Sequence, residues 1–244
     1  MASSQHHDPE SLLPFDDTPK GCTASFEEHV RQGFIRKGYG LLAAQLAVTT
    51  VISALGVLMP GVAWWLRSSG VSFLSSIFSF VFLIALRCFQ SKYPYNLQLL
   101  FAFTVCESVT VACIVSQFAA DVVVQALVLT TSVVGALTAY TFRSGKDFGF
   151  LGGYLFSGLI SLMCWGFLGA VFGFGMGLLY SLAGAILFSA YIVYDTSRLL
   201  HTYTPDEYIE ATIQLYLDII NLFIYILRIL NDNKRSSSSR SIEL

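Results

Sequence analysis

The sequence predicts an all-α membrane protein with about seven membrane-spanning helices. Of its 244 residues, 55% are hydrophobic and only 12% are charged, whereas a soluble domain carries about 25% charged residues. The apolar residues are gathered in long runs without formal charge, and a run of about 20 such residues crosses a bilayer as a helix. The net charge of −2 gives no polyelectrolyte signal, so no nucleic-acid partner is expected.

Seven apolar segments follow one another along the chain. They cover residues 38–66, 68–86, 97–118, 122–142, the two halves of 148–194, and 208–230. A single helix over 148–194 would be about 70 Å long against a hydrocarbon core of about 30 Å, so this run must form two spans. Gly173, Gly175 and Gly177 mark the expected turn between them. The first helix is expected to end near Pro60, because proline interrupts helical hydrogen bonding.

Polar segments flank the predicted membrane domain, which covers residues 31–230. Residues 1–30 are rich in Ser, His, Asp, Glu and Pro and are predicted to form a flexible tail. Residues 231–244 are predicted to form a polar C-terminal tail. The first 36 residues contain no early apolar core, so no cleavable signal peptide is expected. The first span would then direct insertion itself.

The basic residues predict that the N-terminus lies in the cytosol. With that orientation most of them fall on the cytosolic side, and the loop between the first two spans carries only Arg67. The side of the C-terminal tail stays open. Seven complete spans place the tail outside, whereas a re-entrant last segment, which contains Glu210 and Asp218, would return it to the cytosol.

Two carboxylates lie within the last two apolar segments, and they are the main candidates for function. Asp195 is near the end of the sixth span and Asp218 is within the seventh. An ionisable group at such depth costs several kcal/mol unless it is partnered or hydrated. The midpoint between the two falls in the polar turn 201–207, so a helical hairpin places them at the same depth.

Such a pair has a defined chemistry. Two facing carboxylates cannot both ionise cheaply, so the pair is expected to titrate as one unit that shares a proton. The same oxygens suit Ca²⁺, which is a hard cation. Proton and cation would compete for one site, which is the simplest form of a pH-sensitive cation gate.

Polar stripes on both helices support an inward orientation of the pair. Helical spacing aligns Tyr191, Asp195 and Arg198 in the sixth span, and Gln214, Asp218, Asn221 and Tyr225 in the seventh. Polar stripes in membrane helices turn toward protein or water. Tyr191, Arg198, Gln214 and Asn221 are therefore candidate pathway-lining residues.

Purely structural interpretations remain open at this point. Asp195 could be paired only with Arg198, and Asp218 could be hydrogen-bonded only to Asn221. Glu107, deep in the third span, is either a third ionisable group of the pathway or a packing carboxylate that bonds Ser108 or Thr104. Arg87 closes the second span, where it is either an interfacial anchor or a latch on Asp195.

Several stretches resemble the Bax-inhibitor-motif, or Lifeguard, family. The segments AYIVYDTSRLL (190–200) and DEYIEATIQLYLDIINLFIYILRIL (206–230) are similar to its sixth helix and its closing signature. FIRKGYGLLAAQLAVT (34–49), KYPYNLQLLFAFT (92–104) and KDFGFLGGYLF (146–156) match earlier parts in order. The resemblance extends over about residues 31–230.

The resemblance implies seven transmembrane helices with the last one central. It also implies a pH-sensitive Ca²⁺-permeable leak channel of an intracellular membrane, ER or Golgi, with a role in suppressing cell death. By motif, Asp195 and Asp218 would be the pH-sensing pair and tentative Ca²⁺ ligands, with Arg87 as their closing partner. No enzymatic activity and no resident cofactor are implied. The expected partners are the lipid bilayer, Ca²⁺, protons and cell-death regulatory membrane proteins.

Two other classes of function are kept as alternatives. A non-conducting membrane scaffold that acts through partner proteins is compatible with the sequence. An intramembrane aspartyl protease would also carry aspartates on its sixth and seventh helices, and Tyr194–Asp195 fits the first protease motif. The second site reads Tyr216-Leu217-Asp218, without the glycines that let a substrate backbone approach, which argues against proteolysis.

Overall fold

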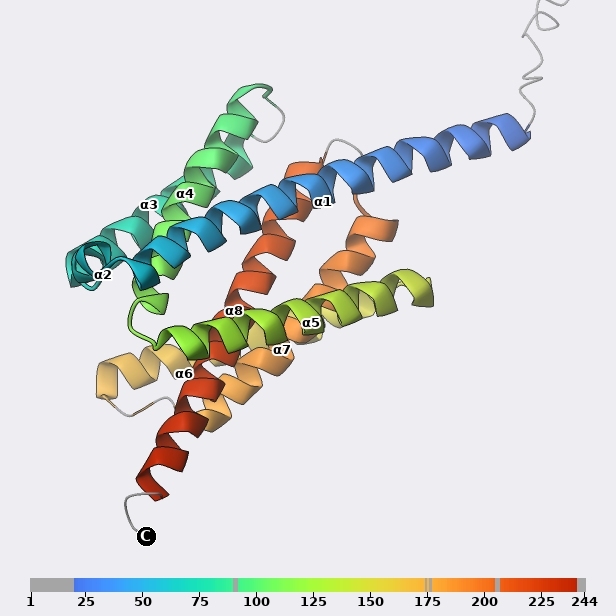
Figure 1. The fold of residues 1–244 in the computed structure, drawn as a ribbon. Coiled ribbons are helices and arrows are strands. Elements are labelled where there is room, and N and C mark those ends of the chain that lie inside the picture. The colour runs from blue at the N-terminus through green and yellow to red at the C-terminus, as the bar shows by residue number, and fades with distance from the viewer. Residues whose placement is uncertain (1–19, 90–91, 174, 176, 205–206, 241–244) are drawn as a thin grey trace, which may run out of the picture.

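A computed structural model describes residues 20–89, 92–173, 175, 177–204 and 207–240. The described chain forms a bundle of helices (Figure 1), with one short 3-10 helix at Gly149–Leu151. The helices are α1 (Lys20–Leu58), α2 (Pro60–Leu66), α3 (Ser69–Phe89), α4 (Tyr95–Val115), α5 (Ala120–Ser144), α6 (Gly152–Phe172), α7 (Leu178–His201) and α8 (Tyr208–Arg240). Over these residues, seven helices are long and apolar enough to cross a membrane, and α2 is the exception. The predicted all-α membrane fold is therefore confirmed.

Proline and glycine set two of the helix boundaries, as the sequence indicates. α1 ends at Leu58, and Pro60 occupies the first turn of the separate helix α2, where its missing N–H costs nothing. The run 38–66 is thus two helices. Gly173 follows the end of α6 with a φ of 71°, a left-handed conformation that glycine adopts without strain. The long run 148–194 is divided here, as expected.

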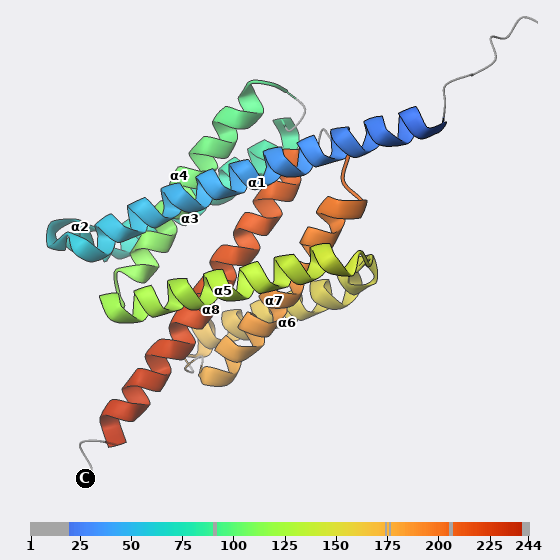
Figure 2. The same cartoon turned by 45° about the vertical axis from the view of Figure 1, so that its right-hand side comes forward.

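α8 lies at the centre of the bundle. It packs against α7, α5, α1 and α4, and Figures 1 and 2 show it passing between two groups of helices. α1, α3 and α4 lie on one side of it, and α5, α6 and α7 lie on the other (Figure 2). In its apolar window 61% of the residues are buried, against 44% or less in every other span. The side chains of Tyr216 and Leu227 are completely buried.

α8 also crosses the whole bundle. It is one unbroken helix of 33 residues, or about 48 Å at 1.5 Å per residue, which exceeds a hydrocarbon core of about 30 Å. The last segment is therefore long enough for a complete span. Its C-terminal end lies at the opposite end of the bundle from the start of α1 (Figure 1).

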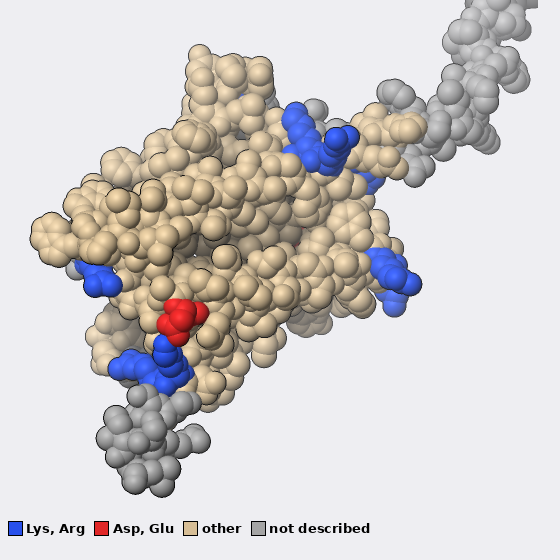
Figure 3. All heavy atoms as spheres, viewed as in Figure 1, with Lys and Arg blue, Asp and Glu red and all other residues tan. Residues whose placement is uncertain are grey.

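The outer surface suits a lipid environment. Large apolar side chains such as Trp64, Phe73 and Leu179 are at least 71% exposed, which is unusual for a soluble protein. Figure 3 shows an almost uncharged surface over most of the bundle, with basic side chains near its ends. This distribution is typical of a bilayer-embedded protein.

Both predicted tails are shorter than the sequence suggested. α1 begins at Lys20, so residues 20–30 are helical, while residues 1–19 of the predicted flexible tail lie outside the described residues. α8 continues to Arg240, so most of the predicted tail 231–244 is helical as well. Once a helix is nucleated, extending it by one residue costs little free energy. In addition, Lys234 Nζ lies 2.5 Å from Asp121 Oδ2 and ties this extension to α5.

Candidate functional site

A short capped turn aligns α7 and α8 as a hairpin. Glu207 accepts hydrogen bonds from the backbone N and the Oγ1 of Thr204, both at 2.9 Å. The Glu207 N in turn donates to the Thr204 O at 3.0 Å. This is a reciprocal capping arrangement at the start of a helix. The bonds from Thr204 lower the pKa of the Glu207 carboxyl below its usual value. The turn therefore fixes where α8 starts relative to the end of α7.

The hairpin brings Asp195 of α7 and Asp218 of α8 together. Their side chains lie within hydrogen-bonding reach of each other, and they are only 4% and 5% exposed. The equal depth that the sequence spacing predicts is thus observed. Asp195 Oδ1 and Asp218 Oδ2 are both buried without a hydrogen-bond partner in the described chain. Buried carboxyl oxygens in that condition are costly, so the pair is poised to take up a proton or a cation.

An open pocket of about 530 Å³ surrounds the pair and lies between α6, α7 and α8. The polar residues that line it are Tyr180, Tyr191, Tyr194, Asp195, Arg198, Gln214, Asp218, Asn221 and Tyr225. The two polar stripes inferred from helical spacing therefore face a single cavity. The four candidate pathway-lining residues on α7 and α8 all lie in it, although their role in a pathway stays a prediction.

The structural partners expected for the two aspartates are only partly present. Arg198 Nη1 lies 3.6 Å from Asp195 Oδ1, which is an ion pair at a distance longer than a hydrogen bond. Asn221 donates to the backbone O of Leu217 at 2.8 Å and not to Asp218. Among the described residues, the ion pairs include none for Asp218. The acidic side chain that Asp218 faces is therefore that of Asp195.

A chain of polar contacts leads from the pair to one end of the bundle. Arg198 Nη1 donates to Gln214 Oε1 at 3.1 Å, and Tyr203 OH donates to the same oxygen at 2.6 Å. Gln214 Nε2 donates to Glu210 Oε1 at 3.3 Å, and Glu210 also pairs with Arg87. Burial raises the pKa of the Tyr203 phenol above its usual value, so this group stays protonated as a donor.

Sequence reasoning missed Glu210 and Tyr203 as members of this chain of contacts. Glu210 carries the same helical spacing as the stripe, because it lies four residues before Gln214 and eight before Asp218. That signal was available in the sequence. Tyr203 lies in the turn after α7, where no periodicity could indicate its orientation.

Arg87 pairs with Glu210, and no ion pair of the described residues joins it to Asp195; its role as a closing partner stays a prediction. Arg87 is in the last turn of α3, and Glu210 is in the first turn of α8, so both lie at the same end of the bundle. Asp195 lies deeper, six residues before the end of α7 at His201. The Arg87 side chain is 54% exposed, which also agrees with an anchor near the membrane surface.

Glu107 lies outside the carboxyl pocket. On α4 it accepts a hydrogen bond from Ser79 of α3 at 2.7 Å. The alternatives considered from the sequence, Ser108 and Thr104, are engaged elsewhere, since Ser108 donates to the Thr104 O at 2.6 Å. Glu107 therefore joins α3 to α4 as an interhelical contact. A part in an ion pathway stays a prediction.

A second polar cluster, not anticipated from the sequence, joins α1, α4 and α8. Thr49 Oγ1 lies 2.9 Å from Ser108 Oγ and 2.8 Å from Tyr216 OH. Nearby, Gln45 Nε2 donates to Thr104 Oγ1 at 2.8 Å. These bonds hold the central helix against α1 and α4 in a region where each unsatisfied polar group is expensive.

No group of three or more His, Cys, Asp or Glu side chains suited to a metal ion occurs in the described parts of the chain. The carboxyl pair thus contributes two acidic side chains. Neutral oxygens of Gln214, Asn221 and the pocket tyrosines lie around it. This set is poor for tight Ca²⁺ binding, which takes six to eight oxygens, but it suits a cation that passes with part of its water shell.

The fold and the site define a multi-pass α-helical membrane protein with a buried carboxyl pair on its last two spans. The family model described as "Inhibitor of apoptosis-promoting Bax1" matches residues 31–235, and the chain belongs to this family. The resemblance found in the sequence is thereby confirmed.

Similar proteins come from plants, animals and viruses. The chain is 48% identical over 210 residues to "BI1-like protein" of Arabidopsis thaliana, which covers 84% of this chain and 82% of that protein. It is 39% identical over 232 residues to "Protein lifeguard 4" of Mus musculus, with coverage of 94% and 98%. It is 42% identical over 224 residues to "Golgi anti-apoptotic protein" of vaccinia virus strain Lister, with coverage of 90% and 94%.

Proposed function

We propose that the protein is a pH-sensitive Ca²⁺ leak pathway of an intracellular membrane that restrains cell death. The observation that carries the proposal is the pair Asp195–Asp218, buried in an open pocket with one oxygen on each carboxyl that makes no hydrogen bond within the described chain. In this proposal the pair is the gate, and it exchanges a proton for a passing cation.

Competition between proton and cation follows from electrostatics. With the proton bound, the pair carries one negative charge and holds itself together through a shared hydrogen bond. With the proton released, two adjacent negative charges repel in a medium of low dielectric constant. A divalent cation between them relieves that repulsion. Acidification is therefore expected to reduce the leak, and alkalinisation is expected to increase it.

The chain of contacts through Gln214 supports a gate that responds to its surroundings. Arg198 neutralises part of the charge on Asp195, and Gln214 connects Arg198 to the Arg87–Glu210 pair. Release of Asp195 from Arg198 would therefore disturb contacts at the end of α3. In the proposed cycle, Arg87 acts through Glu210 as the closing partner.

The cellular role and the compartment rest on the relatives. Their printed names include "Bax inhibitor 1" and "Golgi anti-apoptotic protein". We extend a cell-death suppressing role to this chain and assign it to the Golgi or ER membrane, with the N-terminus in the cytosol. The proposed activity is conduction, with no enzymatic step.

Reconstitution of the full-length protein into liposomes with an internal Ca²⁺ dye tests the proposal. Asp195→Asn and Asp218→Asn should each lower Ca²⁺ entry and remove its dependence on pH. Asp121→Asn is the matched control, because Asp121 is a membrane-end aspartate that pairs with Lys234 away from the pocket. If both pocket variants show the same Ca²⁺ entry and the same pH dependence as the wild type, the proposed gate is refuted. No entry above protein-free liposomes would favour a non-conducting scaffold.

A further inference from the structure

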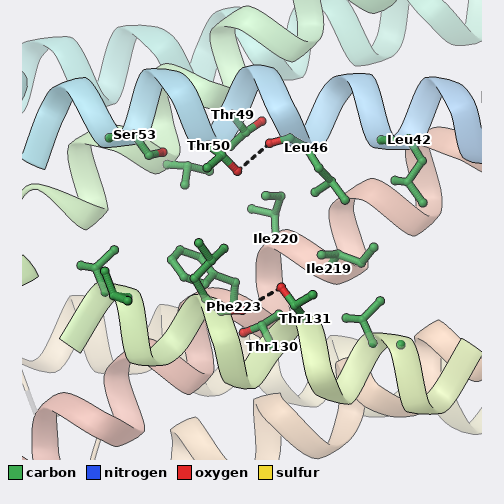
Figure 4. A pocket seen from close by; sticks show the side chains of 18 of the residues that line it. Leu42, Leu46, Thr49, Thr50, Ser53, Thr130, Thr131, Ile219, Ile220 and Phe223 are labelled. Carbon is green, nitrogen blue, oxygen red and sulfur yellow. Dashed lines mark hydrogen bonds between the residues drawn. The ribbon is translucent and has the colours of Figure 1, made fainter. Parts of the chain in front are cut away.

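A larger cavity lies against α8, and it shares no lining residue with the carboxyl pocket. It has a volume of about 720 Å³ and is lined by α1, α5 and α8, together with Val111 of α4. α1 and α5 both pack against α8 but make little contact with each other. α8 thus forms the floor of a groove, with Ile219, Ile220 and Phe223 between the two walls (Figure 4).

The groove is elongated and runs across the membrane. α1 lines it from Tyr39 to Leu58, and α5 lines it from Ala120 to Ala139. Each wall is therefore about 28 Å long at 1.5 Å per residue, which is close to the hydrocarbon thickness of about 30 Å. An occupant must be long and narrow to fill such a space.

Most hydroxyl groups that line the groove are already hydrogen-bonded within the protein, so the lining offers few sites for a polar ligand. The hydroxyls of Thr50, Thr130 and Thr131 donate to the carbonyls of their own helices at 2.8, 2.7 and 2.8 Å, which is a common solution for threonine in membrane helices. Figure 4 shows these threonines beside the apolar side chains of the walls and floor. The hydroxyls of Ser53 and Tyr39 are two buried exceptions, without a hydrogen-bond partner among the described residues.

The groove opens laterally toward lipid. Leu58 on the α1 wall and Val124 on the α5 wall both line the groove and are 73% and 59% exposed, and both belong to candidate membrane spans. Figure 3 shows the surface hollowed between the two walls. A chain from the bilayer could therefore enter sideways while its headgroup stays at the membrane surface.

Basic side chains flank one end of the groove. The rings of Tyr39 and Phe142 approach to 5.9 Å there and join the two walls. Arg36 precedes Tyr39 by about one turn, and Arg143 follows Phe142, and both arginines are exposed. The ion pairs of the described chain include neither arginine. Figure 3 shows basic side chains over this end of both α1 and α5. Two guanidinium groups are well suited to a phosphate.

We infer that the groove is a phospholipid site, with one acyl chain lying against α8 and the phosphate between Arg36 and Arg143. The length and apolar lining fit an extended hydrocarbon chain, and the basic side chains on both walls at one end of the groove fit an anionic headgroup. A rigid sterol would fill only part of the length. The inference does not rest on ion conduction, so its test stands apart from the flux assay.

Photo-crosslinking of the full-length protein in nanodiscs tests the site. The probe is a phosphatidylglycerol with a diazirine in one acyl chain, and the labelled peptides are identified by mass spectrometry. Labelling is expected on residues 39–58 and 120–139. Gly135→Leu should reduce it at least fivefold, because Gly135 lines the groove and a Cβ there meets nothing within 4 Å. Gly153→Leu on α6 is the control, since its Cβ is equally free.

The headgroup contact has its own variant. Replacing Arg36→Gln or Arg143→Gln should weaken labelling about fivefold each, as expected for one basic residue near an anionic headgroup. Arg36 and Arg143 are exposed and do not line the groove. Their substitutions therefore test the phospholipid site even if Gly135→Leu does not fold. Equal groove labelling in Gly135→Leu and Gly153→Leu would overturn the inference. Groove labelling by a diazirine fatty acid or a photo-sterol, with none by the phospholipid, would overturn it as well.

Discussion

The contact between Gly184 and Tyr225 predicts a large effect from one added methyl group. A Cβ built at Gly184 on α7 would lie 2.5 Å from the Cε1 and Cζ atoms of the Tyr225 ring on α8. Real side chains do not approach so closely, so the ring or the helix must move. Tyr225 has little freedom, because its ring stacks on Phe188 at 5.8 Å and its OH donates to the Tyr180 OH at 3.3 Å.

The net cost of Gly184→Ala follows from two opposing terms. Overpacking of this kind costs about 1–3 kcal/mol. Alanine in place of glycine favours a helix interior by about 0.8–1 kcal/mol. The variant should therefore be less stable by up to about 2 kcal/mol, or up to about 8 °C in unfolding temperature for a chain of this length. Gly135→Ala, whose Cβ meets nothing within 4 Å, should be neutral or more stable.

Thermal unfolding of the purified proteins in one detergent, followed by tryptophan fluorescence or light scattering, measures both variants. A third variant, Tyr225→Leu, identifies the cause, because it removes the ring that the added methyl group of Gly184→Ala would overlap. In that background Gly184→Ala should lose most of its penalty. If Gly184→Ala is as stable as Gly135→Ala, or equally destabilising with and without the Tyr225 ring, then α7 and α8 do not pack as closely as the structure shows.

Two further variants test the hairpin and the chain of contacts. Thr204→Val removes the Oγ1 of the capping turn and should destabilise the protein by about 1 kcal/mol. Because the pKa of Glu207 is lowered in the folded state by its bonds to Thr204, the contribution of this carboxylate should be present at neutral pH. It should be lost as the pH falls below the usual pKa of a glutamate and through the lowered pKa of the folded state, which unfolding across a pH series would reveal. Gln214→Leu leaves Arg198 and Tyr203 without their shared acceptor and should cost about 1–3 kcal/mol. Gln214→Asn keeps an amide that can both accept and donate, one methylene shorter, and should lose less stability. Equal unfolding temperatures for the two substitutions would argue against the contacts at Gln214.

Features that depend on hydrophobic length and local backbone chemistry were predictable from the sequence. The seven spans follow from uncharged runs, and Pro60 and the glycine cluster at 173–177 mark boundaries because they act on their own backbone. The depth of Asp195 and Asp218 was also predictable, since a hairpin makes depth a simple function of distance from its turn. The polar stripes gave the orientation of both carboxyls.

Side-chain partners between distant helices were not predictable in the same way. The Arg87–Glu210 pair joins residues 123 positions apart, and the Glu107–Ser79 bond depends on how α3 packs on α4. No local pattern encodes these choices. The flexibility predicted for residues 20–30 was wrong for a different reason, because their polar composition hid the fact that they form the start of α1, where adding residues to a helix costs little free energy. Residues 231–240 are polar, as predicted, and continue α8.

The position of α8 makes the carboxyl pocket and the lipid groove neighbours. Asp218 faces the pocket, while Ile219 and Ile220, the next two residues, face the groove. Because a helix is stiff, rotation or tilt of α8 that separates Asp218 from Asp195 must also move Ile219 and Ile220 against whatever fills the groove. A bound acyl chain would then oppose or favour opening according to which position of α8 leaves it more room. Flux measured with and without Gly135→Leu would show this coupling as a change in Ca²⁺ entry at constant pH, whereas equal entry would mean that the two sites share a helix without sharing a movement.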